Sequence, residues 1–162
     1  MKTILLAGLA LWAGAAPALA LECPLSHAIY GQAGHDVEMR FRPLSSDDAV
    51  NQILAFRVRF GGIDEVFEGG VYIPNGFGSA LGSIGVGCVD DFDTDCRFWE
   101  GTVYVLLDGG IAELPHESGQ MAPQQVLLPQ FAQAVWYSGY RGAGFGVDLE
   151  LRDVFTLKAC AK

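Results

Sequence analysis

Three segments of the chain alternate polar and apolar residues with a period of two. Segment 35–42 (HDVEMRFR) alternates charged residues with Val, Met and Phe, and segment 53–60 (ILAFRVRF) places two Arg residues between Phe and Val. Segment 147–151 (VDLEL) repeats the pattern near the C-terminus. A period of two is that of a β-strand with one buried face, whereas an α-helix needs about 3.6. These segments therefore predict half-buried strands.

Further strands and the turns between them follow from apolar runs and glycine punctuation. Apolar runs predict strands at 66–73, 81–89, 102–107 and 154–160. Asn75-Gly76 and Asp108-Gly109-Gly110 are typical of hairpins, and Gly61-Gly62 and Gly69-Gly70 indicate turns or bulges. The sequence thus predicts an all-β fold, an antiparallel β-sandwich or small barrel of about seven to nine strands.

Two short helices are predicted outside the sheet. Ser45-Ser46-Asp47-Asp48 offers an N-cap and acidic first turn for the segment AVNQIL. Pro129 suits the first helical position of QFAQAVWY, whose Phe131, Ala134 and Val135 would then share one face. Residues 115–125 lack periodicity and predict an exposed loop.

The first twenty residues are typical of a secretory signal peptide. Lys2 precedes an apolar run over 4–13, and Ala18-Leu19-Ala20 fits the cleavage site. The run is shorter than the roughly 20 residues that span a bilayer. We therefore expect a cleaved peptide at 1–20 and a single exported domain at 21–162, periplasmic or extracellular, with no membrane insertion of the mature chain.

Four cysteines, Cys23, Cys88, Cys96 and Cys160, lie in that domain. An exported chain folds where thiols oxidise, so two disulfides are expected among three possible connectivities. A local Cys88–Cys96 bond is favoured, which leaves Cys23 to pair with Cys160. A zinc site is disfavoured because the chain has no C-x-x-C pair.

The chain is acidic, with a formal net charge of −9. It has no cluster of Lys and Arg that would offset this charge locally, and an acidic surface repels phosphate backbones. Nucleic acid is therefore excluded as a partner, whereas a divalent cation or a basic partner would suit the charge.

The segment 87–101, GCVDDFDTDCRFWEG, holds the best chemical lead. Asp91, Asp93 and Asp95 have the D-x-D-x-D order that opens many calcium loops, but Cys96 stands where the EF-hand pattern requires glycine. Two interpretations stay open: a calcium site, which would be the only cofactor implied by the sequence, or a solvated turn closed by a disulfide.

A second lead is the aromatic segment that ends the predicted helix. Trp136, Tyr137, Tyr140 and Arg141 are residue types that anchor binding surfaces, and the glycines around them would let them project. The alternative is that these rings cover the core while the glycines make turns.

No catalytic motif stands out. The chain has no G-x-S-x-G elbow, and His116-Glu117 lacks the second histidine of H-E-x-x-H. We therefore expect a binding or structural module of the cell envelope or extracellular space, with a protein or carbohydrate ligand. The alternatives are a small extracytoplasmic hydrolase and a domain stabilised by calcium at the aspartate loop.

Overall fold

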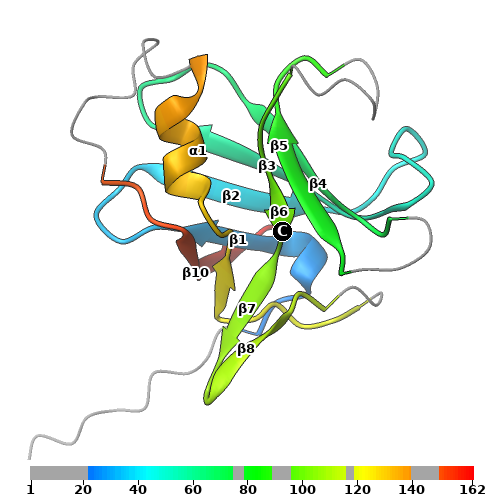
Figure 1. Ribbon diagram of the computed structural model, residues 1–162. Coiled ribbons are helices and arrows are strands. Elements are labelled where there is room, and N and C mark those ends of the chain that lie inside the picture. Colours follow the sequence, from blue (N-terminus) through cyan, green and yellow to red (C-terminus); the bar gives the residue numbers. More distant parts are fainter. Residues whose placement is uncertain (1–21, 75–78, 89–95, 116–118, 140–149) are drawn as a thin grey trace, which may run out of the picture.

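The fold is a single antiparallel sheet of ten strands that curls into a nearly closed barrel (Figure 1). The computed structural model describes residues 22–74, 79–88, 96–115, 119–139 and 150–162. The strands are β1 (Ala28–Gly31), β2 (Val37–Arg42), β3 (Gln52–Phe60), β4 (Phe67–Tyr72), β5 (Leu81–Gly85), β6 (Arg97–Thr102), β7 (Tyr104–Leu107), β8 (Gly110–Glu113), β9 (Gln125–Leu127) and β10 (Val154–Cys160). A 3-10 helix, η1 (Leu25–His27), precedes β1, and one α-helix, α1 (Phe131–Tyr137), lies between β9 and β10.

The barrel is nearly closed because the chain itself links the two ends of the sheet. The strand order is β6-β5-β4-β3-β2-β1-β10-β9-β7-β8, so β6 lies at one edge and β7 next to the other. Val103 alone separates β6 from β7 along the chain. Across the same closure, Ser79 Oγ donates a hydrogen bond of 2.6 Å to Glu113 Oε1. Beyond it, the β7–β8 hairpin extends at the bottom of the barrel in Figure 1.

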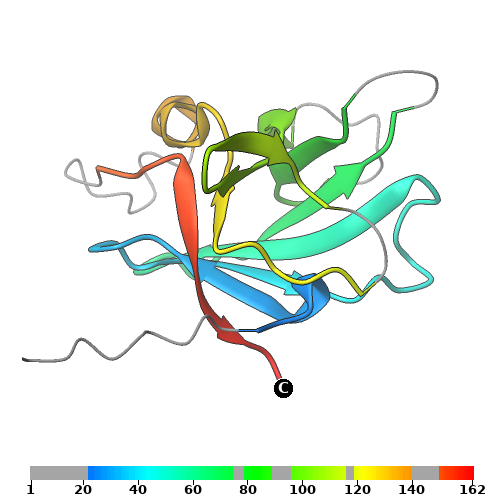
Figure 2. The same cartoon turned by 90° about the horizontal axis from the view of Figure 1, so that it is seen from below.

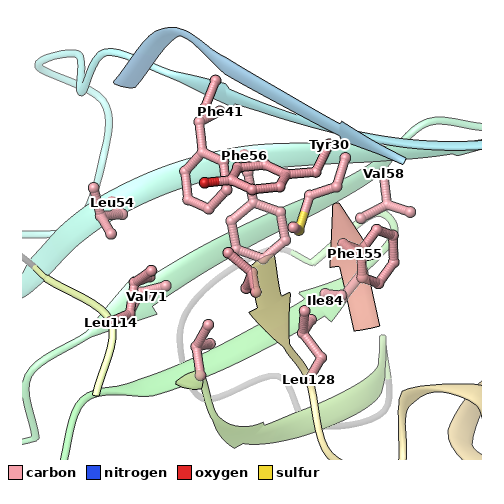
Figure 3. Packing of buried hydrophobic residues seen from close by; sticks show 14 of the residues in the cluster. Tyr30, Phe41, Leu54, Phe56, Val58, Val71, Ile84, Leu114, Leu128 and Phe155 are labelled. Carbon is pink, nitrogen blue, oxygen red and sulfur yellow. The ribbon is translucent and has the colours of Figure 1, made fainter. Parts of the chain in front are cut away.

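Aromatic and branched side chains fill the barrel. Tyr30, Phe41 and Phe56 come from β1, β2 and β3 and pack together in Figure 3, with ring centroids 5.2 Å apart for Phe41 and Phe56. The hydroxyl of Tyr30 donates to the carbonyl of Pro123 at 2.9 Å. Burial raises the pKa of Tyr30 and keeps this phenol neutral.

Helix α1 covers one end of the barrel, and Figure 2 shows it end-on beside the curved sheet. Phe131 and Val135 are buried, and the Phe131 ring packs on Phe60, Phe98 and Phe155. Asp153 caps the helix from outside, since its carboxylate accepts hydrogen bonds of 2.9 Å from the backbone N–H groups of Gln130 and Ala132. The helix is therefore fixed to the sheet at its N-terminus and along one face.

Two disulfides tie the chain, in the pairing favoured from the sequence. Cys23 bonds Cys160, joining the segment before η1 to the end of β10, and Cys88 bonds Cys96 between β5 and β6. Among the described residues no helix is long and apolar enough to cross a membrane.

Several sequence predictions are confirmed. The all-β antiparallel fold is present as a barrel, with ten strands rather than seven to nine. The alternating segment 35–42 contains β2, segment 53–60 lies within β3, which begins one residue earlier, and 154–160 coincides with β10. Asp108-Gly109 turns the β7–β8 hairpin, and α1 buries the predicted face, although it begins at Phe131 and not at Pro129.

Other predictions are wrong. Gly69-Gly70 lies within β4 and makes no turn or bulge. No helix forms after Ser45, because the Asp48 carboxylate accepts hydrogen bonds from Ser45 and Arg42 and closes a turn instead. The predicted strand 102–107 is divided between β6 and β7, and most of β6 lies outside any predicted strand. The predicted strand 147–151 is wrong at Glu150 and Leu151, which lie outside the sheet, while residues 147–149 lie outside the described residues.

Candidate functional site

A row of small residues crosses the outer face of the barrel. Ala55 on β3 pairs with Gly70 on β4, and Gly70 pairs with Ser83 on β5. Each neighbours a core residue along its strand, so the row points away from the core. These positions are nevertheless buried, because longer side chains rise around them. Gly70 and Ser83 line a depression on the solvent side of the sheet, whereas Ala55 lies next to it on β3.

Two adjoining hollows occupy this depression. The larger has a volume of about 750 Å³ and the smaller about 170 Å³. Both are lined by Tyr72, Ser83 and Arg97, so they share a boundary across β4, β5 and the start of β6. We call the two hollows together the outer groove. Its lining also includes Arg42, Asp48, Gln52, Arg57, Glu68 and Glu100.

Gly70 lets two side chains lie across the floor of the outer groove. A Cβ at this position would stand 2.6 Å from the Tyr72 hydroxyl and 2.8 Å from Gln52 Nε2. The phenol and the amide therefore occupy the space directly above the glycine. The smaller hollow adds Pro74 and Leu81 beside Tyr72, which gives this end of the outer groove an apolar wall.

Arg42 and Asp48 form the most firmly built wall of the outer groove. The guanidinium donates two hydrogen bonds, 2.8 Å from Nη1 to Oδ2 and 2.6 Å from Nη2 to Oδ1. The backbone N–H of Ser45 adds a third at 2.5 Å, and only 9% of the Asp48 side chain is exposed. Arg42 holds the pKa of the Asp48 carboxyl well below its usual range, mainly through these hydrogen bonds. The pair is therefore fully charged at neutral pH.

Two further ion pairs line the outer groove. Arg57 Nε donates to Glu68 Oε1 at 2.8 Å, across the β3–β4 pair, with both side chains about half exposed. Arg97 Nη1 lies 3.4 Å from Glu100 Oε2 on the same strand, and the Arg97 side chain is only 18% exposed. Together the two hollows hold three arginines and four carboxylates, the fourth being Asp47.

The outer groove ends at the Cys88–Cys96 disulfide. Cys88 lines the larger hollow, and its Sγ lies against Gly85, where a Cβ would stand 2.8 Å from the sulfur. On the far side, Cys96 and Arg97 line a third hollow of about 300 Å³ together with Tyr137 and Ser138 of the α1 end. The fold therefore brings Cys96 and Tyr137, one described residue from each sequence lead, to the same hollow.

The individual residues of those leads are only partly described. Trp136 and Tyr137 lie on the outer side of α1 and are 40% and 76% exposed, so the aromatic rings do reach the surface. Tyr140 and Arg141 lie outside the described residues, as do Asp91, Asp93 and Asp95 of the calcium hypothesis. The described part of the chain holds no group of three His, Cys, Asp or Glu side chains that could bind a metal ion.

Four residues of the outer groove are not recognisable from the sequence as site residues: Arg57, Tyr72, Ser83 and Arg97. Their signal lies in three neighbouring strands, where outward positions carry Ala, Gly and Ser instead of long polar residues. That signal becomes visible only when the strand register is known, because the three positions are far apart in the sequence.

Comparisons of the chain with protein-family models, with curated proteins and with solved structures found no match. The fold and its cross-links therefore define the class directly: a disulfide-bonded antiparallel β-barrel domain. Two disulfides indicate an oxidising, extracytoplasmic environment.

Proposed function

We propose that the protein is an exported binding domain that holds a small polar ligand in the outer groove. The observation that carries the proposal is the larger hollow on the outer face of the sheet, whose lining includes the paired small residues Gly70 and Ser83. The larger hollow, at about 750 Å³, falls within the size range of ligand sites in proteins.

The walls of the outer groove support a binding role. Arg42 is held in place by two hydrogen bonds to Asp48, and Arg57 and Arg97 each contact a carboxylate. Polar groups fixed in this way can recognise a ligand without being ordered first, which lowers the entropic cost of binding. The disulfide at the end of the outer groove also links the segment after β5 covalently to the start of β6.

The composition of the outer groove favours binding over the hydrolase alternative. A serine nucleophile requires a neighbouring base, usually histidine, held in turn by a carboxylate. Ser83 and several carboxylates line the outer groove, but its lining among the described residues includes no histidine. The groups present are suited to hydrogen bonding, and the described lining lacks the histidine that usually activates a serine hydroxyl.

Export would account for the N-terminal segment and for the two disulfides. The N-terminal segment 1–20 has the charge, apolar run and small-residue end of a signal peptide. An exported single domain at 21–162, periplasmic or extracellular, would form its two disulfides on arrival. N-terminal sequencing of the exported protein should begin at Leu21; a chain that keeps residues 1–20 and stays in the cytoplasm would contradict this part of the proposal.

Binding is tested by NMR on the purified protein. Neutral, acidic and basic sugars and amino acids are titrated to millimolar concentration while the arginine Nε–Hε signals are followed. We expect the ligand to shift the signals of Arg57 and Arg97, and Arg57→Ala to weaken binding.

Arg59→Ala is the matched control. Arg59 lies two positions along β3 on the same outer face, but it is not among the residues that line the outer groove. Equal loss of binding in both variants, or shifts confined to signals outside the outer groove, would refute the assignment. No shift with any compound would refute the binding role itself.

A further inference from the structure

The charges of the outer groove are already matched within the protein. Arg42, Arg57 and Arg97 each contact a carboxylate at 3.4 Å or less, and the groove contains four carboxylates against these three arginines. An anionic ligand would have to displace a carboxylate or face uncompensated negative charge, in a chain whose net charge is −9. A cationic ligand would have to compete with the arginines. The charge pattern therefore favours a neutral ligand.

A ligand rich in hydroxyl groups fits the hydrogen-bonding pattern. A guanidinium offers five N–H donors and a carboxylate about four acceptor positions, so an ion pair presents donors and acceptors side by side. A hydroxyl group both donates and accepts, and can therefore bridge the two members of such a pair. Asn51, Gln52 and Ser83 add two amides and a hydroxyl to the lining.

The apolar wall fits the other side of a sugar. Tyr72 lies over Gly70 and lines both hollows, with Pro74 and Leu81 next to it in the smaller one. The C–H face of a pyranose ring packs on an aromatic ring, while its hydroxyl edge points to polar groups. Tyr72 therefore offers an apolar ring surface next to the Arg57–Glu68 and Arg97–Glu100 ion pairs.

The extent of the outer groove fits more than one sugar unit. The two hollows adjoin at Tyr72, Ser83 and Arg97 and continue from the β3 side of the sheet to β6. A chain of linked rings could therefore occupy both hollows at once. We infer that the outer groove binds a neutral oligosaccharide, with Tyr72 as the stacking platform and the Arg57–Glu68 and Arg97–Glu100 pairs as hydroxyl partners. This inference rests on the proposed binding function.

The test compares tetrasaccharides that differ in charge. Binding of cellotetraose and chitotetraose, which are neutral, is measured by isothermal titration calorimetry and saturation-transfer NMR beside acidic tetragalacturonate and the basic chitosan tetramer. We expect at least one neutral tetrasaccharide to bind, and more tightly than both the acidic and the basic tetrasaccharide.

Variants of the platform locate the sugar. Tyr72→Ala should weaken binding about tenfold, since it removes the stacking surface, whereas Tyr72→Phe should retain most of the affinity. Gly70→Ala should also weaken binding, because the added Cβ displaces the phenol and the Gln52 amide. Circular dichroism and melting curves establish that each variant is folded, and Arg59→Ala again serves as the unaffected control.

The possible failures are distinct. If the neutral tetrasaccharides do not bind while a charged sugar or an amino acid binds in a way that depends on Arg57, the neutral-sugar inference is overturned and the binding role stands. If a neutral tetrasaccharide binds equally well to the Tyr72→Ala and Arg57→Ala variants, the outer groove is not its site. If nothing binds, the inference and the proposed function fall together.

Discussion

The ring of Phe56 on β3 lies against Gly69 on β4, and its Cε2 and Cζ atoms occupy the space that a Cβ at Gly69 would need. Phe56 is 1% exposed and packed among core residues, so its ring has nowhere to move. We expect Gly69→Ala to lower the free energy of unfolding by about 1–3 kcal/mol, the usual cost of overpacking. Chemical denaturation measures the change.

Gly70→Ala is the matched comparison, because Gly70 faces the outer groove instead of the core. Its Cβ would meet the ends of the Tyr72 and Gln52 side chains, which can shift toward solvent. We expect the free energy of unfolding to change by less than about 0.5 kcal/mol. An equal loss of stability in the two variants would show that the two glycines do not lie on opposite faces as described.

The second prediction concerns Asp48. Because its folded pKa is lowered, its contribution to stability is present above the unfolded pKa of about 4 and is lost as pH falls through the folded value. Asp48→Asn should therefore cost about 2 kcal/mol at neutral pH, the scale of a hydrogen bond to a charged group. The difference between wild type and variant should shrink below about pH 4.

Thermal melting across the acidic range checks this dependence. Asp47→Asn is the control. The Asp47 carboxylate accepts a hydrogen bond of 3.4 Å from Ser46 Oγ and takes no part in the Arg42–Asp48 ion pair. A constant difference between the Asp48→Asn variant and wild type from pH 7 to pH 2 would contradict the role given to the Asp48 charge.

The third prediction compares the two disulfides. Their sequence separations are 137 and 8 residues, for which loop entropy gives contributions of about 5 and about 2.6 kcal/mol. Replacing Cys23 and Cys160 by serine should therefore destabilise the domain more than replacing Cys88 and Cys96. Guanidinium denaturation of the two double variants ranks them, and the reverse order would mean that the ends are held mainly by strand pairing.

The fourth prediction separates the two interpretations of the aspartate loop. If Asp91, Asp93 and Asp95 bind calcium, the melting temperature should rise with calcium, corresponding to about 2.7 kcal/mol at a hundredfold excess over the dissociation constant. Changing all three to asparagine should abolish the rise. An unchanged melting temperature at millimolar calcium would leave the solvated turn as the correct interpretation.

The sequence predicts those strands whose two faces meet different surroundings. β2 and β3 alternate because one face meets the core and the other meets solvent. β1 is buried at all four positions, so it has no alternation to detect, and β9 is only three residues long. Most of β6 was missed because it directly follows the aspartate-rich ring closed by Cys96.

The candidate site was less predictable than the fold. Gly69 and Gly70 are adjacent glycines that indicate a turn when only local preference is considered. In the sheet, one accommodates Phe56 and the other Tyr72, so both are explained by neighbours distant along the chain. Pairing between strands decides the positions of Ala55, Ser83 and Arg97 in the same way, and one sequence does not reveal that pairing.

The passage from β6 to β7 through Val103 joins the two ends of the sheet by one continuous stretch of backbone. The outermost strands of the sheet, β6 and β8, therefore belong to one continuous segment, since only a single residue lies between β6 and β7 and β7 leads directly into the β7–β8 hairpin. Arg97 and Glu100 of the outer groove belong to β6, and the protruding β7–β8 hairpin follows directly after Val103. The wall of the outer groove and the β7–β8 hairpin are therefore consecutive parts of one segment, so the single residue Val103 sets how the hairpin is placed relative to that wall.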